Sequence, residues 1–224
     1  MKERLVVVGN GMAGMKVVEE LVERYPNEFD IAVFGAEPHG NYNRIMLSPV
    51  LGGEKQFEDI LIHDAAWYEQ HGITLHAGED KEVIEIDRIR RLVVAADGTT
   101  EHYDRLLLAT GSRPSVLNVP GNDLDGVMAF RSIADVEAML SSAELHSEAL
   151  VLGGGLLGLE AANGLAARGM KVTVIHHRQH ILNRQLDAQA SELLQAELMS
   201  RGVEFKLMAE VERLEADASG RVSN

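Results

Sequence analysis

Two glycine-rich turns contain residue types and spacing that could hold an anion. The first is Gly9-Asn10-Gly11-Met12-Ala13-Gly14, which follows the apolar stretch Leu5–Val8, and the second runs from Gly153 to Gly158. In G-x-G-x-x-G spacing the first glycine permits a tight turn, the second lets the backbone approach a pyrophosphate, and the third lets helix and strand pack closely. One such match is a weak signal, but two in the same context are stronger. The chain is therefore expected to hold two dinucleotides.

The residues that follow each turn bear on which dinucleotide is bound. Glu37 lies a little over ~20 residues beyond Gly14, where an acidic side chain meets ribose hydroxyls in such folds. A solvated loop acid is the alternative interpretation of Glu37. The corresponding place in the second copy holds His176-His177-Arg178. With no carboxylate there and an arginine nearby, a 2′-phosphate would not be repelled, so NADPH is as admissible as NADH.

The composition of the chain excludes several other classes of function. Its 224 residues include 35 acidic and 21 basic side chains, for a net charge of −14, which repels nucleic-acid backbones and anionic membrane surfaces. The absence of cysteine excludes disulfides, cysteine nucleophiles and thiolate-held iron–sulfur clusters from this chain. No apolar run is long enough for a signal peptide or a membrane span, and we expect a cytoplasmic location. The nine histidines show no metal-ligand spacing, so no metal site is expected.

Strands and helices are predicted to alternate around the first turn. β-rich stretches at Leu5–Val8 and Ile31–Phe34 flank a segment with helical periodicity, Met12–Arg24, which predicts a βαβ unit with a parallel sheet. The further elements expected in this copy are a helix around Glu58–Gln70, a strand at Ile73–His76, three alternating strands with a hairpin turn at Asp97-Gly98, and a closing strand at Leu106–Ala109.

The second copy repeats this order in a shorter form. Its expected elements are a strand from Leu150, a helix at Leu156–Arg168, a strand at Lys171–Ile175, a helix at Ala188–Arg201 and a strand at Val203–Leu207. The connection before it is expected to hold a short strand at Val127–Phe130 and a helix after a Ser132 cap. This copy reaches Val211–Leu214 and a turn at Ala218–Gly220 without a closing strand, and an uncovered sheet edge is a liability. We therefore expect a truncated longer protein, with a naturally shorter second domain as the alternative.

Four segments carry a family resemblance: "VVVGNGMAG", "GAEPHGNYNRIMLS", "LLLATGSRP" and "GGGLLGLEAANGLAARG". Together they resemble the pyridine nucleotide–disulfide oxidoreductase superfamily, and are most similar within it to the N-terminal flavoprotein part of the nitrite reductase [NAD(P)H] large subunit. Ferredoxin and rubredoxin reductases are more general relatives. The resemblance implies FAD in the first turn, NAD(P)H in the second, and hydride transfer between them followed by electron transfer to a metal centre. A fragment of a stand-alone ferredoxin or rubredoxin reductase and a non-catalytic nucleotide-binding module are the alternatives.

The expected fold is thus α/β, with two Rossmann-like βαβ units, parallel sheets and an antiparallel β-meander, and with the second unit apparently truncated. The expected division is an FAD-binding domain, first segment, over residues 1–112, a structured connection over 113–147, and an incomplete NAD(P)-binding domain over 148–224. The resemblance implies that the FAD domain is completed only after the inserted NAD(P) domain.

The resemblance also implies cofactor contacts at particular residues. For FAD these are Gly9, Gly11, Met12, Ala13 and Gly14 of the turn, Glu37 as the ribose acid, Arg44 near the flavin phosphates, and Ser48, Val83, Thr110 and Gly111. For the nicotinamide nucleotide they are Gly153, Gly155, Leu156, Leu157, Gly158, Glu160, His176 and Arg178. Arg44 as a solvated loop residue and Glu160 as a glutamate that stabilises the helix dipole remain open. No side chain is expected to act as a catalytic acid or base, because the hydride chemistry belongs to the cofactors.

The sequence departs from its apparent relatives in three ways. Disulfide reductases carry a redox cysteine in the segment "NYNRIMLSPVL", and this chain has none, so electrons cannot pass through a protein dithiol. Many ferredoxin reductases have a lysine where Pro49 follows Ser48 here. The sirohaem and iron–sulfur centres of nitrite reductase need cysteines, so they are expected only in a longer parent protein. The expected partners are a nicotinamide dinucleotide, an electron-accepting metal domain or protein, and a second copy in a homo-oligomer.

Overall fold

The computed structural model describes residues 2–223, which form two compact units. The first unit contains the residues up to Arg44 together with Ile60–Arg113, and the second contains Ile45–Asp59 together with the residues from Pro114 onward. The chain therefore passes between the units three times. The division expected from the sequence kept residues 45–59 with the first unit and set residues 113–147 apart as a connection, whereas residues 45–59 and 114–147 both belong to the second unit here.

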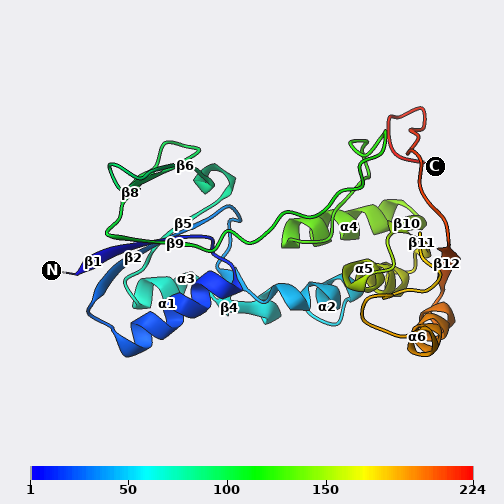
Figure 1. Ribbon diagram of the computed structural model, residues 1–224, viewed down its shortest axis with the longest axis horizontal. Helices are drawn as coiled ribbons and strands as arrows, with labels where there is room; N and C mark the ends of the chain where they lie inside the picture. The colour runs from blue at the N-terminus through cyan, green and yellow to red at the C-terminus, as the bar shows by residue number, and fades with distance from the viewer. Residues whose placement is uncertain (1, 224) are drawn as a thin grey trace. The chain divides into compact units, whose positions relative to one another are not determined.

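A four-stranded parallel sheet forms the centre of the first unit, in the order β5-β2-β1-β9 (Figure 1). Its strands are β1 (Glu3–Val8), β2 (Phe29–Gly35), β5 (Thr74–Ala77) and β9 (Arg105–Leu108), and α1 (Met12–Arg24) connects the first two. In the register of the sheet, Val8 lies opposite both Phe34 and Leu108. The carboxyl ends of three strands therefore lie at one edge, where the first glycine turn leaves β1. The predicted βαβ unit is confirmed.

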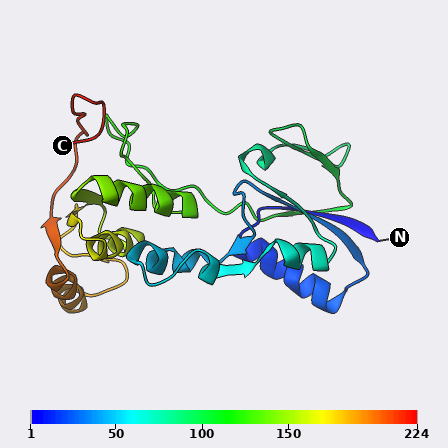
Figure 2. The same cartoon turned by 180° about the vertical axis from the view of Figure 1, so that it is seen from behind.

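Both faces of this sheet are covered, which explains why β1 is apolar at consecutive positions rather than at alternate ones. Leu5 and Val7 pack with Met15 and Val18 of α1 on one face. On the other face, residues of β1 and β2 pack against Val93 of the antiparallel meander. Figure 2 shows the helices and the meander on opposite sides of the sheet from behind. The meander consists of β6 (Val83–Asp87), β7 (Leu92–Ala95) and β8 (Thr100–His102), preceded by a 3₁₀ turn, η3 (Glu79–Lys81).

The helix expected around Glu58–Gln70 forms only in the second half of that range. The segment forms a 3₁₀ turn, η2 (Glu58–Ile60), then β4 (Leu61–His63), and only then a helix, α3 (Ala65–Gln70). The strand forms because Leu61 pairs with Tyr42 of a second short strand, β3 (Asn41–Tyr42). The helix begins where Asp64 accepts a hydrogen bond from the Trp67 N–H at 2.9 Å, as an N-cap residue does.

The second unit is built on a three-stranded parallel sheet in the order β10-β11-β12. Its elements are α4 (Ile133–Leu145), β10 (Glu148–Leu152), α5 (Leu156–Ala167), β11 (Lys171–His176), α6 (Ala188–Ser200) and β12 (Val203–Leu207). These elements and the Ser132 cap of α4 match the sequence predictions. The predicted strand at Val127–Phe130 does not form. That stretch instead follows a turn in which the Val127 N–H donates to Leu124 at 3.1 Å and Gly126 has a φ of +86°.

A short helix, α2 (Leu47–Gly52), follows the 3₁₀ turn η1 (Arg44–Met46) and packs on α5 within the second unit. A Cβ atom on Gly164 would lie 2.8 Å from the Leu51 side chain, so the glycine allows close approach. Arg168 donates to the carbonyl of Leu51 at 2.7 Å and to that of Val50 at 3.1 Å. These carbonyls lie at the carboxyl end of α2, where a cation is favourable. This contact ties residues 45–59 to the second unit.

The residues after β12 lie along the connection that precedes α4. No strand forms at 211–214, where the Leu214 N–H donates to the Pro120 carbonyl at 2.9 Å. The predicted turn near Ala218–Gly220 is present, and one bridge joins Ala216 to Val222. Within residues 2–223, no helix has the length and apolar character needed to cross a membrane.

Candidate functional site

The first glycine turn has two glycines that packing requires and one that packing does not. Gly9 has a φ of +117°, and a Cβ there would lie 2.1 Å from the Ala109 carbonyl oxygen. A Cβ on Gly14 would lie 2.7 Å from the Gly9 carbonyl oxygen. Gly11 has an ordinary φ of −85°, and no described atom would lie within 4 Å of its Cβ. The space in front of Gly11 is therefore open, as close approach of an anion would need.

The second turn repeats this arrangement. Gly153 has a φ of +116°, and a Cβ on Gly158 would lie 2.1 Å from the Gly153 carbonyl oxygen. Gly155 has a φ of −88° and the same open space around its Cβ position. Each turn runs into the first residues of a helix, Met12 and Ala13 of α1 and Leu156 and Leu157 of α5. The N–H groups of these residues lack intrahelical acceptors. Each turn thus presents donors and open space to an anion.

Asn10, the second residue of the first turn, anchors the loop after β2, a role that the sequence analysis missed. Its amide donates to the His39 carbonyl at 3.0 Å, and its side-chain oxygen accepts the Tyr68 hydroxyl at 2.7 Å. The Tyr68 oxygen in turn accepts the Asn41 N–H at 3.1 Å. Burial raises the pKa of Tyr68 to about 12, so the hydroxyl remains a donor at neutral pH. An asparagine between two glycines was visible in the sequence, but its partners were not.

Glu37 and Arg44 form an ion pair just beyond β2. The other carboxylate oxygen of Glu37 accepts the Tyr42 hydroxyl at 2.7 Å, and the Arg44 guanidinium lies 5.1 Å from the centre of the Tyr42 ring. The glutamate expected to bind the ribose and the arginine expected near the phosphates are thus in direct contact with each other. Both side chains are partly exposed, so a bound nucleotide could still reach them.

Backbone hydrogen bonds establish which residues of the two turns are equivalent. Gly9 donates to the Phe34 carbonyl at 2.8 Å, and Gly153 donates to the Ile175 carbonyl at 2.9 Å. Counting three residues onward from each strand residue leads to Glu37 in the first copy and to Arg178 in the second. Arg178 therefore occupies the position in the second unit that Glu37 occupies in the first. Its side chain is exposed.

His176, which was expected to meet the nucleotide, instead faces the interior. Its side chain is buried, and its Nδ1 atom accepts the Gly154 N–H at 3.2 Å. The neighbouring His177 is exposed, and the two rings meet edge to face with their centres 5.0 Å apart. β11 ends with this side chain on its buried side, and a direct contact from His176 to a nucleotide stays a prediction.

Ser48 has its hydrogen-bond partner within the second unit. Its hydroxyl donates to the Glu160 carboxylate at 2.5 Å, and both residues belong to the second unit. Pro49, which occupies the place of a lysine in many ferredoxin reductases, lies within α2. The partner of Glu160 is thus a neutral hydroxyl.

Three other expected residues lie in the first unit. Val83 begins β6 opposite Ala95, and its side chain packs against the cluster beneath the meander. The Ala109 N–H donates to the Val8 carbonyl at 2.8 Å, which places Thr110 and Gly111 beside the first turn. Gly111 has a φ of +72°, a conformation that favours glycine.

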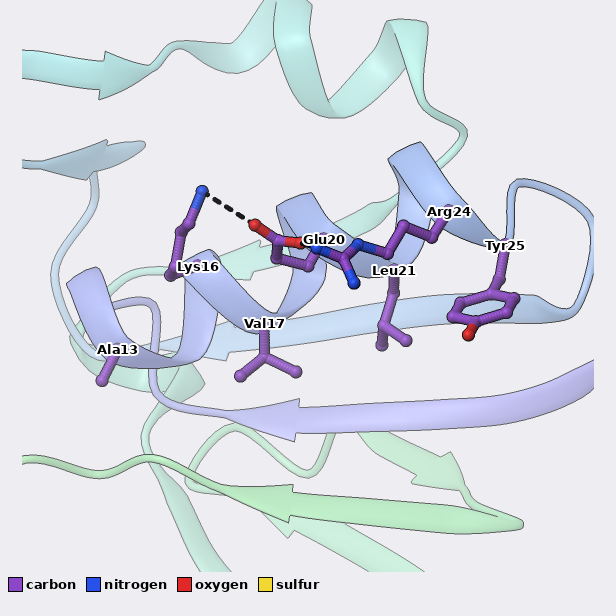
Figure 3. A pocket seen from close by; sticks show the side chains of 7 residues that line it. All are labelled: Ala13, Lys16, Val17, Glu20, Leu21, Arg24 and Tyr25. Atoms are coloured by element: carbon purple, nitrogen blue, oxygen red, sulfur yellow. Dashed lines mark ion pairs between the residues drawn. The ribbon is translucent and has the colours of Figure 1, made fainter.

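An open groove follows the outer side of α1 (Figure 3). Its lining includes apolar side chains such as Val17 and a charged ladder in which Glu20 pairs with Lys16 at 3.3 Å and with Arg24 at 2.9 Å. Glu19 also pairs with Lys16, at 2.7 Å, so two carboxylates balance the two cations. The groove lies along the helix rather than at its start. Among residues 2–223, no group of three histidine or acidic side chains is arranged to hold a metal ion.

Two parallel-sheet units, each with a glycine turn open to an anion, define a dinucleotide-binding α/β protein. The chain belongs to the pyridine nucleotide-disulphide oxidoreductase family, whose sequence profile matches residues 3–223. This confirms the resemblance seen in the sequence. Membership in this family implies FAD and NAD(P)H as the cofactors.

The chain is similar to two proteins of Bacillus subtilis. It is 48% identical to an assimilatory nitrate reductase electron transfer subunit over 206 residues, which is 92% of this chain and 26% of that protein. It is 47% identical to a nitrite reductase [NAD(P)H] over 216 residues, which is 96% of this chain and 27% of that protein. The chain thus spans about a quarter of the length of these relatives.

Solved structures agree with the fold. A ferredoxin reductase from Rhodopseudomonas palustris matches with a TM-score of 0.88 at 26% identity, over 99% of this chain and 54% of that one. An NAD-dependent persulfide reductase from A. fulgidus matches with a TM-score of 0.89 at 27% identity, over 98% of this chain and 42% of that one. The predicted α/β fold class with paired nucleotide-binding units is confirmed.

Proposed function

We propose that the chain is the NAD(P)H- and FAD-binding electron-transfer part of a nitrite or nitrate reductase system. The observation that carries this proposal is the open space at Gly11 and Gly155, since close packing or a positive φ explains the other turn glycines but neither explains these two. The nearly half-identical nitrate and nitrite reductase relatives support the choice of system. A ferredoxin reductase role is the second candidate, supported by 32% identity to a benzene dioxygenase ferredoxin--NAD(+) reductase subunit of Pseudomonas putida.

In this proposal each turn has one cofactor. The first turn would hold the pyrophosphate of FAD at Gly11, with Glu37 binding the ribose and Arg44 the phosphates. The second turn would hold the nicotinamide nucleotide at Gly155, with Arg178 near the ribose. When bound, the two cofactors supply the hydride chemistry. The residues of this chain contribute binding and orientation, so no side chain needs to act as an acid or base.

Glu160 has a positioning partner in the same unit. The Ser48 hydroxyl fixes one carboxylate oxygen of Glu160, near the start of α5 and two residues after the last turn glycine. We assign Glu160 to the nicotinamide amide, because a carboxylate accepts hydrogen bonds from an amide NH₂ group. The sequence supplies no cysteine, so a flavin held by this chain would need an electron acceptor outside it. Sirohaem and an iron–sulfur cluster in a longer parent protein are the acceptors that we propose.

Substituting the two open glycines separately tests this function. Gly11→Val places a side chain in the space for the first pyrophosphate, and Gly155→Val does the same in the second turn. We expect Gly11→Val to lose flavin, measured as visible absorbance of the purified protein, while it still binds NADH or NADPH in a fluorescence titration. Gly155→Val should show the opposite pattern. Gly52→Val is the matched control, because a Cβ there would meet only the flexible end of Glu54, at 3.8 Å.

Two results would contradict the assignment. Full flavin occupancy in Gly11→Val would remove the first turn from the FAD site. Unchanged nucleotide affinity in Gly155→Val would remove the second turn from the nicotinamide nucleotide site. A working electron-transfer site also requires that NADH or NADPH bleach the flavin absorbance of the unsubstituted protein, and failure to bleach a bound flavin would favour a non-catalytic module.

A further inference from the structure

In each unit a space lies between the glycine turn and the end of the neighbouring strand. The side chain that fills it comes from the turn in one unit and from the strand in the other. In the first unit the side chain comes from the turn: a Cβ on Gly35, at the end of β2, would lie 2.7 Å from the Asn10 Cβ. In the second unit it comes from the strand: a Cβ on Gly154 would lie 3.1 Å from the His176 ring. The space between turn and strand end thus admits one side chain, and the second unit places a histidine there.

The hydrogen bond between Gly154 and His176 requires that the Nδ1 atom of the histidine ring be unprotonated. The Gly154 N–H donates to Nδ1 of His176 at 3.2 Å, so Nδ1 carries a lone pair and the ring hydrogen is on Nε2. The Gly154 carbonyl accepts the Leu182 N–H at 2.9 Å. Both polar groups of this glycine are therefore held within the unit, and the buried ring holds one of them.

We propose that His176 is a positioning residue for nucleotide binding, acting through Gly154 to hold the second turn in the conformation that presents the α5 N-terminus to a pyrophosphate. The inference rests on the proposed function of that turn. A ring protonated on both nitrogens has no lone pair for Gly154. Protonation of His176 therefore releases the turn, and nicotinamide nucleotide binding weakens in acid.

The surroundings of the ring set the direction of this effect. Burial lowers the pKa of His176, and the charges of His177 and Arg178 lower it further, whereas contacts with Asn183 and His180 oppose the shift. The neutral ring is therefore the form present at neutral pH. The turn is held above the ordinary histidine pKa of about 6.5 and is released as the pH falls through the lower value in the folded protein.

Two substitutions distinguish the role of His176 as a hydrogen-bond acceptor for Gly154 from the effect of its protonation. His176→Asn keeps an oxygen acceptor near the position of Nδ1 but does not titrate in this range. His176→Phe keeps a ring of similar size but leaves the buried Gly154 N–H without an acceptor. His146→Phe is the control, because it removes an exposed histidine of the same unit. The probe is NADH, titrated calorimetrically into the purified protein at about pH 8 and at a series of lower pH values that extends well below the ordinary histidine pKa of about 6.5.

We expect His176→Phe to weaken NADH binding about tenfold at the higher pH, the effect of one lost buried hydrogen bond. His176→Asn should bind like the unsubstituted protein at the higher pH and should lose less affinity on acidification. Nitrogen-15 NMR of the histidine rings should show hydrogen on Nε2 and not on Nδ1 of His176. An affinity of His176→Phe equal to that of the folded control, or a hydrogen on Nδ1, would overturn the inference. If the unsubstituted protein bound neither NADH nor NADPH, the proposed function itself would fail.

Discussion

Glu37 and Arg44, seven residues apart in the chain, form an ion pair beside the carboxyl end of β2. Tyr42 binds the second carboxylate oxygen, so Glu37 is held from two sides. The sequence suggested a separate cofactor contact for each charged residue. Their pairing means that Arg44 orients Glu37, and that a change at one residue alters the other.

Glu37→Gln should weaken FAD binding because it removes the charge that holds Arg44 and accepts ribose hydroxyls. We expect an increase in the FAD dissociation constant of about tenfold, typical of one charge-assisted hydrogen bond. Fluorescence titration of the flavin-depleted protein would measure it. Glu23→Gln, at an exposed position of α1, is the control and should bind FAD unchanged. Equal FAD affinity in Glu37→Gln and the control would show that Glu37 is a solvated loop acid.

Arg178→Glu should change the choice between nicotinamide nucleotides. Arg178 occupies the place that Glu37 has in the first copy, and a carboxylate there would repel a 2′-phosphate. We expect NADPH binding to weaken by on the order of 1–3 kcal/mol relative to NADH binding. Parallel titrations with both nucleotides measure this difference. Arg184→Glu makes the same charge change in the following loop, and a comparable selectivity shift in that variant would show that only net charge matters.

Tyr68→Phe should destabilise the first unit, because it removes the hydroxyl that joins Asn10 to Asn41. We expect a loss of about 1–3 kcal/mol in the free energy of unfolding, the cost of leaving buried polar groups unpaired. Urea unfolding monitored by circular dichroism would measure the loss. Tyr25→Phe, at a side chain that is 49% exposed, should cost much less. Similar losses in both variants would mean that the hydroxyl network contributes nothing specific.

Tyr68 should also make stability depend on pH in the alkaline range. Its pKa is raised by burial to about 12, whereas an unfolded tyrosine has a pKa of about 10. The contribution of Tyr68 is therefore fully present below about pH 10 and is lost as the pH rises through about 12. The alkaline decline should be smaller in Tyr68→Phe than in the unsubstituted protein.

Patterns local in the chain were enough to predict the two βαβ units. The helical periodicity of Met12–Arg24 and the glycines on either side of Gly11 act over a few residues, and the structure reproduces them. The sequence also placed His176-His177-Arg178 where the first copy has Glu37, and the backbone hydrogen bonds of the two turns narrowed the equivalent residue to Arg178. The roles of these residues toward a cofactor, and a cytoplasmic location, stay predictions.

Other features depended on contacts between residues far apart in the sequence. The six residues of α2 are too few to show a helical period, and they form a helix packed on α5, where Gly164 leaves room and Arg168 binds the last carbonyls. The segment Leu61–His63 became a strand because β3 was available to pair with it.

The sequence by itself determined that two glycine turns follow two strands, because turn geometry and helix starts depend on neighbouring residues. Only the tertiary structure decided which side chains support those turns. The burial of His176 depends on the pairing of β11 with β10 and β12. The hydrogen bond from Ser48 to Glu160 joins residues 112 positions apart in the chain. Burial and hydrogen bonding are properties of the assembled chain, since each needs a partner that folding brings into contact.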